Sequence, residues 1–226
     1  PPAYVETLFD QHAEAFEAIL VGGLGYRVPE ALAERLAALA GPDARLSVLD
    51  LGCGTGLGVA ALGGMAARAD GVDLSGGMLE AAAETGLYDA LYQDEAVAFL
   101  EGDPDAAPDA PFLDADGDPL GPWDLILAAD VAPYLGDLGP LIGAAAHRLA
   151  PGGRLALSVE TLPEAAFDVR GWRVGPHQRF HHSEGHLRAR LAAAGLAVEA
   201  LDPWTIRTND GRPEPGWLAV ARRTSD

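Results

Sequence analysis

Apolar runs of strand length alternate with helical patterns through the middle of the chain. The segments that predict strands are LSVLDLG (46–52), ADGVDLS (69–75), ALYQ (90–93), the strongly apolar DLILAADV (124–131) and GRLALSVE (153–160). Helical patterns lie between them and begin near residues 56, 76, 95 and 137. Strands separated by helices at this spacing predict a parallel sheet that is covered by helices on both faces.

The two ends of the chain have other patterns. Residues 4–20 and PEALAERLAALA (29–40) predict two helices ahead of the first strand. Near the other end, Ser183 is a candidate N-cap for a helix over 184–194, and Gly195 is a candidate stop. LAVEALDPW (196–204) and GWLAVARR (216–223), joined by RTNDGRPEP, predict an antiparallel pair of strands. The stretches 101–122 and 160–183 are expected to be loops.

The composition favours one globular domain and excludes several classes of function. The chain has 226 residues, of which 49% are hydrophobic, and its net charge is −19. Nucleic acid is not an expected partner, because such binding depends on Lys and Arg against phosphates. One cysteine, Cys53, excludes an internal disulfide. No apolar run approaches the roughly 20 residues that span a bilayer, and no secretory signal is visible. We therefore expect a cytoplasmic protein that does not contact membranes.

A glycine-rich segment, VLDLGCGTGLGVA (48–60), contains the first predicted strand and the turn after it. In a doubly wound sheet, ligands bind at the carboxyl ends of the strands, and a turn without Cβ atoms lets a ligand approach the backbone. Gly52, Gly54 and Gly56 follow the spacing G-x-G-x-G, whereas the dinucleotide fingerprint needs a glycine where Leu57 stands. This difference argues against a nicotinamide-dependent dehydrogenase.

Two aspartates end the first two predicted strands. Asp50 can orient the glycine turn or bind an ammonium group, and Asp73 is well placed to accept hydrogen bonds from both hydroxyls of a ribose. A hydrogen bond to a charged group contributes roughly 1.5–3 kcal/mol. This pattern suits a nucleoside that carries an amino-acid end and a sulfonium better than it suits a pyrophosphate.

Four motifs, VLDLGCGTG, GVDLSGGML, DLILAADV and LAPGGRLALSVE, resemble in order and spacing those of class I S-adenosylmethionine-dependent methyltransferases. The resemblance implies an α/β, Rossmann-like, doubly wound sheet of about seven strands, ordered 3-2-1-4-5-7-6 with the last strand antiparallel, and two extra N-terminal helices. It implies one domain over 1–226, with a helical lid at 1–45 and a cofactor-binding core at 46–160. An acceptor loop, a C-terminal helix and a β-hairpin would then occupy 161–226.

The segment YVETLFDQHAEAFEAILVGGLGYRVPEAL (4–32) is similar to a bacterial subgroup that is often attached to tetratricopeptide repeats. The chain opens on Pro-Pro, and this finer resemblance implies a repeat domain ahead of it. A monomer and a homodimer both remain open as the state of association.

The resemblance also implies which residues contact the cofactor, S-adenosyl-L-methionine, and its product S-adenosyl-L-homocysteine. The positions that match the family motifs are Asp50, Gly52, Cys53 and Gly54 for the methionine end, Asp73 for the ribose, Leu74 and Met78 for the adenine face, Asp94 and Glu95 for the adenine edge, Ala129 and Asp130 at the fourth strand, and Tyr26 as a lid residue.

The acceptor is expected to be a small molecule that binds beside the long segment after the fifth strand. Candidate contacts are Tyr134, Glu160 and Arg179, and His181 or His182 is the candidate general base for an acceptor that must lose a proton. We expect in-line methyl transfer without a metal, because the His182–His186 pair has no third ligand at a firm spacing. The motifs do not distinguish methylation of O, N, S or C. A non-catalytic sensor or partner subunit that binds the same nucleoside is the alternative.

Overall fold

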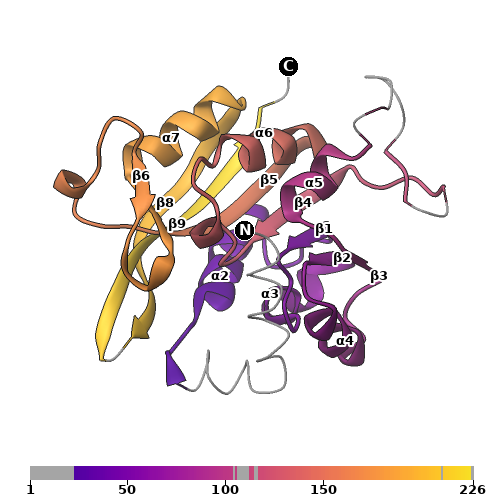
Figure 1. The fold of residues 1–226 in the computed structure, drawn as a ribbon. Coiled ribbons are helices and arrows are strands. Elements are labelled where there is room, and N and C mark those ends of the chain that lie inside the picture. Colours follow the sequence, from indigo (N-terminus) through magenta and orange to yellow (C-terminus); the bar gives the residue numbers. More distant parts are fainter. Residues whose placement is uncertain (1–22, 104, 106–111, 115–116, 210, 225–226) are drawn as a thin grey trace.

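The computed structural model describes residues 23–103, 105, 112–114, 117–209 and 211–224. In this part of the chain one mixed sheet has the order β3-β2-β1-β4-β5-β9-β8 (Figure 1). Its strands are β1 (Leu46–Leu51), β2 (Ala66–Asp73), β3 (Ala90–Gln93), β4 (Trp123–Ala128), β5 (Leu149–Glu160), β8 (Leu196–Asn209) and β9 (Arg212–Arg223). Strands β1 to β5 are parallel, and β9 is antiparallel to both β5 and β8. The predicted Rossmann-like fold and strand order are confirmed, with β8 and β9 as the sixth and seventh strands.

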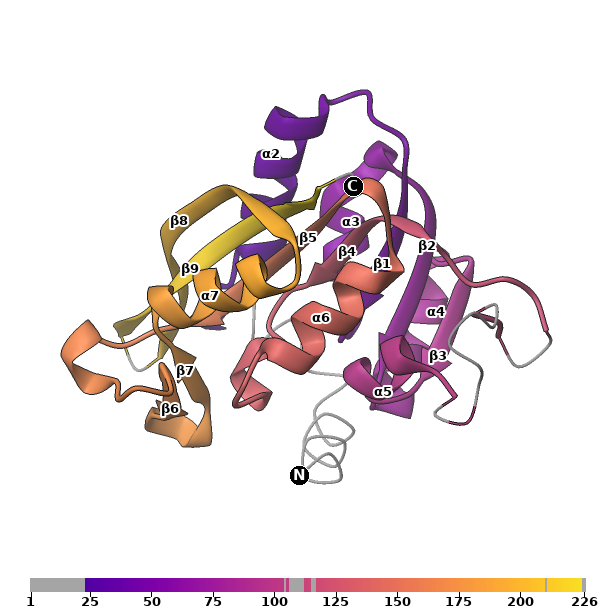
Figure 2. The same ribbon diagram turned by 90° about the horizontal axis from the view of Figure 1, so that it is seen from above.

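Helices cover both faces of the sheet, as the alternating pattern predicts (Figures 1 and 2). One face carries α2 (Val28–Ala40), α3 (Leu57–Leu62) and α4 (Gly76–Thr85), and the other carries α5 (Ala96–Glu101), α6 (Gly139–Arg148) and α7 (Glu184–Ala193). The helix predicted over 4–20 lies outside the described residues. No described helix is long and apolar enough to cross a bilayer.

The central strands supply two separate hydrophobic cores. On β1, Val48 belongs to the core beneath α2, whereas its neighbour Leu49 belongs to the core beneath α6. Leu125 and Ile126 on β4 divide between the same two cores. Side chains alternate between the faces of a strand, so a strand buried on both faces has to be apolar almost throughout.

The helix boundaries follow the expected capping chemistry. Ser75 and Ser183 accept hydrogen bonds of 3.1 Å from the amides of Met78 and His186, which caps α4 and α7. The helix that contains Pro29 ends at Gly41, whose φ of 90° is costly for residues with a Cβ atom.

Two segments that were predicted as loops contain strands. The segment 160–183 includes a hairpin of β6 (Trp172–Val174) and β7 (Phe180–His182), in which the rings of Trp172 and Phe180 lie 5.5 Å apart. Strands of three residues are too short for an alternating pattern to reveal them. The predicted connection 207–215 is mostly strand, because β8 continues to Asn209 and β9 begins at Arg212. The prolines in this part of β9 precede its pairing with β5, which starts at Gly216, so the strand edge tolerates them.

Candidate active site

A cavity of about 580 Å³ lies at the carboxyl ends of β1, β2 and β4. This volume falls in the range of small-molecule sites, roughly 300–1,000 Å³. Because β1 lies between β2 and β4, the turn after β1 lines the middle of the cavity. The residues that follow β2 and β3 line one side, and those that follow β4 line the other.

The backbone conformation of the turn after β1 explains why its sequence is rich in glycine. Gly52, Gly54 and Gly56 have φ angles of 63°, 53° and 99°, which residues with a Cβ atom adopt only with strain. A Cβ atom on Gly52 would also lie 2.7 Å from Val131 Cγ2. The turn is tied to the neighbouring strand by the amide of Cys53, which donates to the carbonyl of Val72 at 3.0 Å. A ligand can therefore approach the backbone of this turn closely.

Asp50 is buried at the end of β1 and borders the cavity. Tyr88 donates a hydrogen bond of 2.8 Å from its hydroxyl to Asp50 Oδ2. Burial raises the pKa of Asp50 from its usual 3.8 to about 7, and the hydrogen bond from Tyr88 opposes part of this rise. Sequence reasoning missed Tyr88, because it lies between α4 and β3 in no recognisable motif.

Asp73 connects the end of β2 to the glycine turn. Its Oδ2 accepts a hydrogen bond of 2.9 Å from the amide of Gly54, and its Oδ1 accepts one of 2.9 Å from the amide of Ser75. Asp73 also lines the cavity. The structure therefore gives this carboxylate a role in shaping the turn, in addition to the expected position for a ribose.

The structure brings most of the other expected cofactor residues to the cavity. Leu74, Asp94 and Glu95 line the side beyond β2 and β3. Glu95 also caps α5 through two hydrogen bonds of 2.9 Å from backbone amides. Met78, by contrast, is completely buried and is not one of the residues that line the cavity, so the structure does not show the expected adenine contact.

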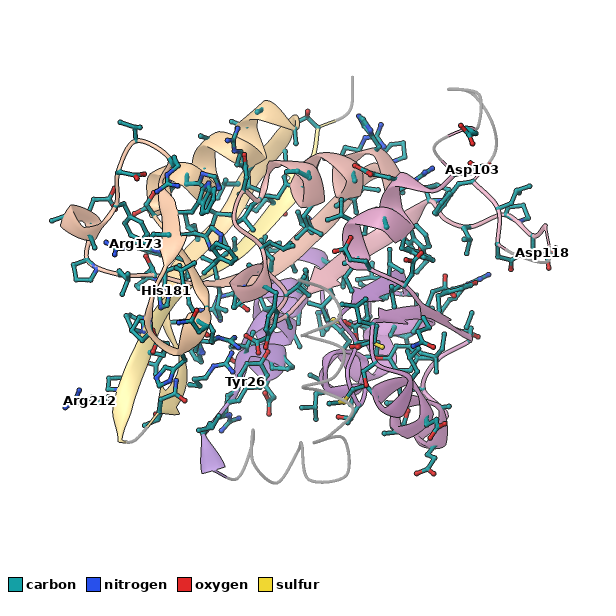
Figure 3. All side chains as sticks on the ribbon, in the orientation of Figure 1. Tyr26, Asp103, Asp118, Arg173, His181 and Arg212 are labelled. Atoms are coloured by element: carbon teal, nitrogen blue, oxygen red, sulfur yellow. The ribbon has the colours of Figure 1, made fainter. Side chains whose placement is uncertain are left out.

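The opposite side of the cavity is formed by the β4 end, the β6–β7 hairpin and the N-terminal side of α2. Ala129, Asp130 and Tyr134 line it, together with Phe180 and Tyr26. Tyr26, which is labelled in Figure 3, is buried and lines the cavity. Asp130 has a φ of 66°, an uncommon conformation for a residue other than glycine.

The predicted acceptor contacts are joined in one ion-pair network. Arg179 donates to Glu160 at 2.8 Å, to the Tyr134 hydroxyl at 2.8 Å and to Asp130 Oδ1 at 2.6 Å. Arg207, on β8, donates to the same oxygen of Asp130 and lies 3.3 Å from Glu160. Burial raises the pKa of Glu160, while the two arginines oppose that rise. No sequence motif had indicated Arg207.

Neither His181 nor His182 is among the described residues that line the cavity. His181 is fully buried, with Nε2 2.9 Å from Glu214 and Nδ1 3.1 Å from the carbonyl of Arg179 (Figure 3). His182 Nε2 lies 2.8 Å from the carbonyl of Gly136, so this nitrogen carries the proton and donates. Burial lowers the pKa of His182 to about 4. The geometry therefore offers neither imidazole to a bound acceptor as a base.

One cluster among the described residues has the composition of a metal site. Candidate ligand atoms of Glu160, His181 and Glu214 lie within 4.8 Å of one another. Both nitrogens of His181 already have hydrogen-bond partners, and Arg179 and Arg207 flank Glu160. Cations beside a carboxylate disfavour a further cation there. We assign this cluster to the ion-pair network.

The charge of the cavity distinguishes a ligand that carries a pyrophosphate from one that carries positive charge. Five carboxylates line it, and no arginine, lysine or histidine does so among the described residues. These carboxylates are Asp50, Asp73, Asp94, Glu95 and Asp130. Such walls repel a pyrophosphate and suit a ligand with an ammonium and a sulfonium. The exposed backbone of the glycine turn fits the same ligand, so the residues present fit S-adenosylmethionine.

This fold and this cavity define a class I S-adenosylmethionine-dependent methyltransferase. Residues 24–201 match the family model described as a methyltransferase domain, and the chain belongs to that family. The ubiquinone biosynthesis O-methyltransferase of Xylella fastidiosa (strain 9a5c) is 30% identical over 190 residues, which cover 77% of this chain and 72% of that protein.

Two of the solved structures that share the fold have a bound cofactor or its product. Magnesium protoporphyrin IX methyltransferase from Synechocystis PCC 6803, with bound S-adenosylmethionine, has a TM-score of 0.65 at 16% identity, covering 99% of this chain and 97% of that one. The 1,6-didemethyltoxoflavin-N1-methyltransferase from Burkholderia thailandensis, with bound 1,6-didemethyltoxoflavin and S-adenosylhomocysteine, has a TM-score of 0.66 at 17% identity, covering 99% and 88%. Likeness at this identity establishes the fold and leaves the acceptor open.

Proposed function

We propose that the protein transfers a methyl group from S-adenosylmethionine to a small molecule that binds between the glycine turn and the β6–β7 hairpin. The observation that carries this proposal is the continuity of the cavity. One volume extends from the acidic wall at Asp73 and Asp94 to the aromatic wall at Tyr134 and Phe180. Donor and acceptor can therefore share one cavity.

The donor orientation follows from the order of the strands. Asp73 is proposed to accept the ribose hydroxyls, and the adenine then lies toward β3, beside Leu74 and Asp94. The methionine end lies over the glycine turn, where Asp50 is the nearest buried carboxylate. In this orientation the reactive methyl group points toward β4.

Residues around the β4 end are proposed to hold the acceptor. Tyr134, Leu135 and Phe180 provide an apolar and aromatic surface, and Tyr26 closes the side nearest the glycine turn. The two solved neighbours are named for magnesium protoporphyrin IX and didemethyltoxoflavin, and the curated relative for ubiquinone biosynthesis. These names support a small organic acceptor for this chain as well.

Catalysis is proposed to come mainly from positioning. Methyl transfer from a sulfonium is an in-line displacement, which is accelerated when donor and acceptor are held about 3–3.5 Å apart in a water-poor site. The buried side chain of Tyr26 lines the acceptor side and restricts water there. No metal is part of the proposal.

Three finer points belong to this proposal. They are membership of the subgroup associated with tetratricopeptide repeats, a cytoplasmic location, and a division into lid (1–45), cofactor core (46–160) and acceptor segment (161–226). The motif resemblance of 4–32 supports the first point, although residues 1–22 lie outside the described part. The placement of Tyr26 and Phe180 at the cavity supports the division.

Calorimetric titration with S-adenosylhomocysteine tests the donor half. Wild-type protein is expected to bind it and to bind NADH more weakly. Asp73→Ala is expected to weaken binding roughly tenfold to a hundredfold, as losing charged hydrogen bonds predicts. Asp89→Ala is the matched control, because Asp89 accepts a hydrogen bond of 2.8 Å from the amide of Ala69 on the same strand but does not line the cavity.

Transfer of label from methyl-labelled S-adenosylmethionine to the low-molecular-weight fraction of a cell extract tests the acceptor half. A labelled small molecule is expected. Binding of S-adenosylhomocysteine without any labelled product would favour the sensor instead. Absence of binding by the wild type would overturn the proposal.

A further inference from the structure

We propose that Asp130 binds the acceptor directly through Oδ2, and that the group it receives is a hydroxyl whose oxygen becomes methylated. This inference rests on the proposed function and goes beyond it, because it assigns a catalytic residue and the class of the nucleophile. It also departs from the expectation that Asp130 contacts the cofactor.

Asp130 is held rigidly from three directions. Its amide donates to the buried Ser158 hydroxyl at 3.1 Å, which fixes the backbone at the end of β4. Arg179 and Arg207 both donate to Oδ1, and their side chains are only 13% and 6% exposed. Arg179 comes from the β6–β7 hairpin and Arg207 comes from β8, and both elements lie far from β4 in the sequence. The carboxylate therefore has one orientation.

The backbone of Asp130 is in an unusual conformation. Its φ of 66° lies in the left-handed region, where a residue other than glycine is strained. Strain of this kind persists only where surrounding contacts impose it, and it concentrates at functional sites. Here the surrounding contacts are the hydrogen bond from the Asp130 amide to Ser158 and the ion pairs of its carboxylate with Arg179 and Arg207.

The second oxygen of this carboxylate remains available. Both arginines donate to Oδ1, and Oδ2 has no hydrogen-bond partner among the described residues. Oδ2 is also not one of the described polar atoms that are sealed from solvent without a partner. Because Asp130 lines the cavity, a ligand can reach this oxygen. A fixed carboxylate oxygen with free lone pairs favours a ligand group that can donate a hydrogen bond to it.

The surroundings of Asp130 define the rest of the ligand. Tyr134, Leu135 and Phe180 line the same side of the cavity, so we expect the proposed hydroxyl on an apolar or aromatic body. The strand order places Asp130 on the side of the glycine turn toward which the proposed donor directs its methyl group. Asp130 can thus contact the oxygen that attacks.

The proposed transfer needs only the sulfonium donor, the acceptor hydroxyl and the Asp130 carboxylate. A lone pair of the acceptor oxygen forms the new C–O bond while the S–CH₃ bond breaks, and its electron pair stays on sulfur as the neutral thioether. The O–H proton passes to Asp130 Oδ2 as the oxygen becomes positive, and it leaves to water when the product departs. A carboxylate is a sufficient base for this proton, because an alkylated oxygen that still carries hydrogen is a strong acid.

Asp130→Asn isolates the function of Oδ2. Asparagine tolerates the left-handed conformation and still offers Oδ1 to the two arginines, but it replaces the acceptor Oδ2 with a donor NH₂. We expect the affinity for S-adenosylhomocysteine to stay within about threefold, while turnover at saturating donor falls about a hundredfold or more, the scale of general-base catalysis. Asp202→Asn is the matched control, because Asp202 pairs with Arg35 at 2.7 Å and does not line the cavity.

The product defines the acceptor class. Wild-type protein is incubated with ¹³C-methyl S-adenosylmethionine and the low-molecular-weight fraction of cells of the source organism, and the ¹³C shift separates O-, N-, S- and C-methyl products. An O-methyl product is expected. Asp130→Gly, which suits the backbone at this position, is expected to regain part of its activity when formate supplies the missing carboxylate.

The outcomes separate this inference from the proposed function. An N-, S- or C-methyl product, or full activity of Asp130→Asn, overturns the inference and leaves the methyltransferase intact. If a folded Asp130→Asn protein loses S-adenosylhomocysteine binding as well as turnover, Asp130 contacts the cofactor, and the inference is overturned. Absence of any labelled product from the wild type overturns the proposed function and this inference with it.

Discussion

Tyr88 donates its hydroxyl hydrogen to Asp50 Oδ2 across 2.8 Å, and this bond joins the α4–β3 connection to the end of β1. The same tyrosine ring restricts two glycines. A Cβ atom on Gly56 would lie 3.2 Å from the ring, and one on Gly71 would lie 2.9 Å from it. Tyr88 therefore packs against the glycine turn at Gly56 and hydrogen-bonds the carboxylate that faces the proposed methionine end.

Removal of the Tyr88 hydroxyl is expected to weaken donor binding. Tyr88→Phe keeps the ring against Gly56 and Gly71 but leaves Asp50 Oδ2 without this donor. The hydrogen bond lowers the pKa of Asp50, so its loss raises that pKa and favours the neutral carboxyl group. We expect affinity for S-adenosylmethionine, measured by calorimetry at neutral pH, to fall about tenfold.

Tyr92→Phe provides the comparison for this variant. Tyr92 packs against Phe99 with ring centroids 5.2 Å apart and does not line the cavity. Its donor affinity should match that of the wild type. Equal affinity in Tyr88→Phe and Tyr92→Phe would show that the hydroxyl of Tyr88 does not support the site.

Asp50 is expected to make folding stability depend on pH in the range where few carboxyl groups titrate. Its pKa is about 7 in the folded protein, above its usual 3.8, so its contribution is fully present below pH 4 and is lost as the pH rises through 7. Asp50→Asn removes this loss. The free energy of unfolding of the variant relative to the wild type should rise by about 2–3 kcal/mol between pH 5 and pH 8.

Urea denaturation of both proteins without ligand, at several pH values in this range, measures the effect. The difference between the two proteins cancels the titration of all other groups that the substitution leaves unchanged. Parallel stability curves for the wild type and Asp50→Asn would show that burial does not perturb this carboxyl group.

His182 is expected to control acid stability rather than chemistry. Its folded pKa of about 4 lies below the usual 6.5, so the neutral ring stabilises the protein above pH 6.5, and this contribution is lost as the pH falls toward 4. His182→Gln keeps a donor for the carbonyls of Leu135 and Gly136 and does not titrate. The wild type should therefore lose about 2–3 kcal/mol more than this variant between pH 7 and pH 4.

His182→Phe tests the hydrogen bonds themselves. It leaves the same two carbonyls without their donor and should lower the free energy of unfolding by about 1–3 kcal/mol at pH 7. Methyl transfer by a folded His182→Gln protein should stay near the wild-type rate. A large loss of turnover in that variant, with unchanged stability, would restore His182 as the general base.

Local patterns predicted the sheet and the donor side of the cavity. The strands β1, β4 and β5 are buried on both faces, so their apolar runs were visible without any knowledge of their partners. The glycines of the turn were visible because left-handed φ angles require them. Asp50 and Asp73 followed from their positions at the ends of strands.

The acceptor side depended on contacts between distant parts of the chain. Arg207 meets Asp130 across 77 positions and Tyr88 meets Asp50 across 38, and no short window contains either pair. The histidines illustrate the same limit, because the ordinary pKa of a histidine side chain made His181 and His182 candidates for a general base. In the β6–β7 hairpin both His181 and His182 are fully buried, and neither lines the cavity.

The sequence by itself determined where the buried strands lie along the chain and the conformation of the turn that a nucleoside approaches, because both depend on neighbouring residues. Only the tertiary structure decided which polar groups at the β4 end are bonded to one another and which oxygen of Asp130 remains open. Hydrogen-bond partners drawn from β4, β5, the β6–β7 hairpin and β8 are set by how these elements pack, and local sequence does not encode that packing.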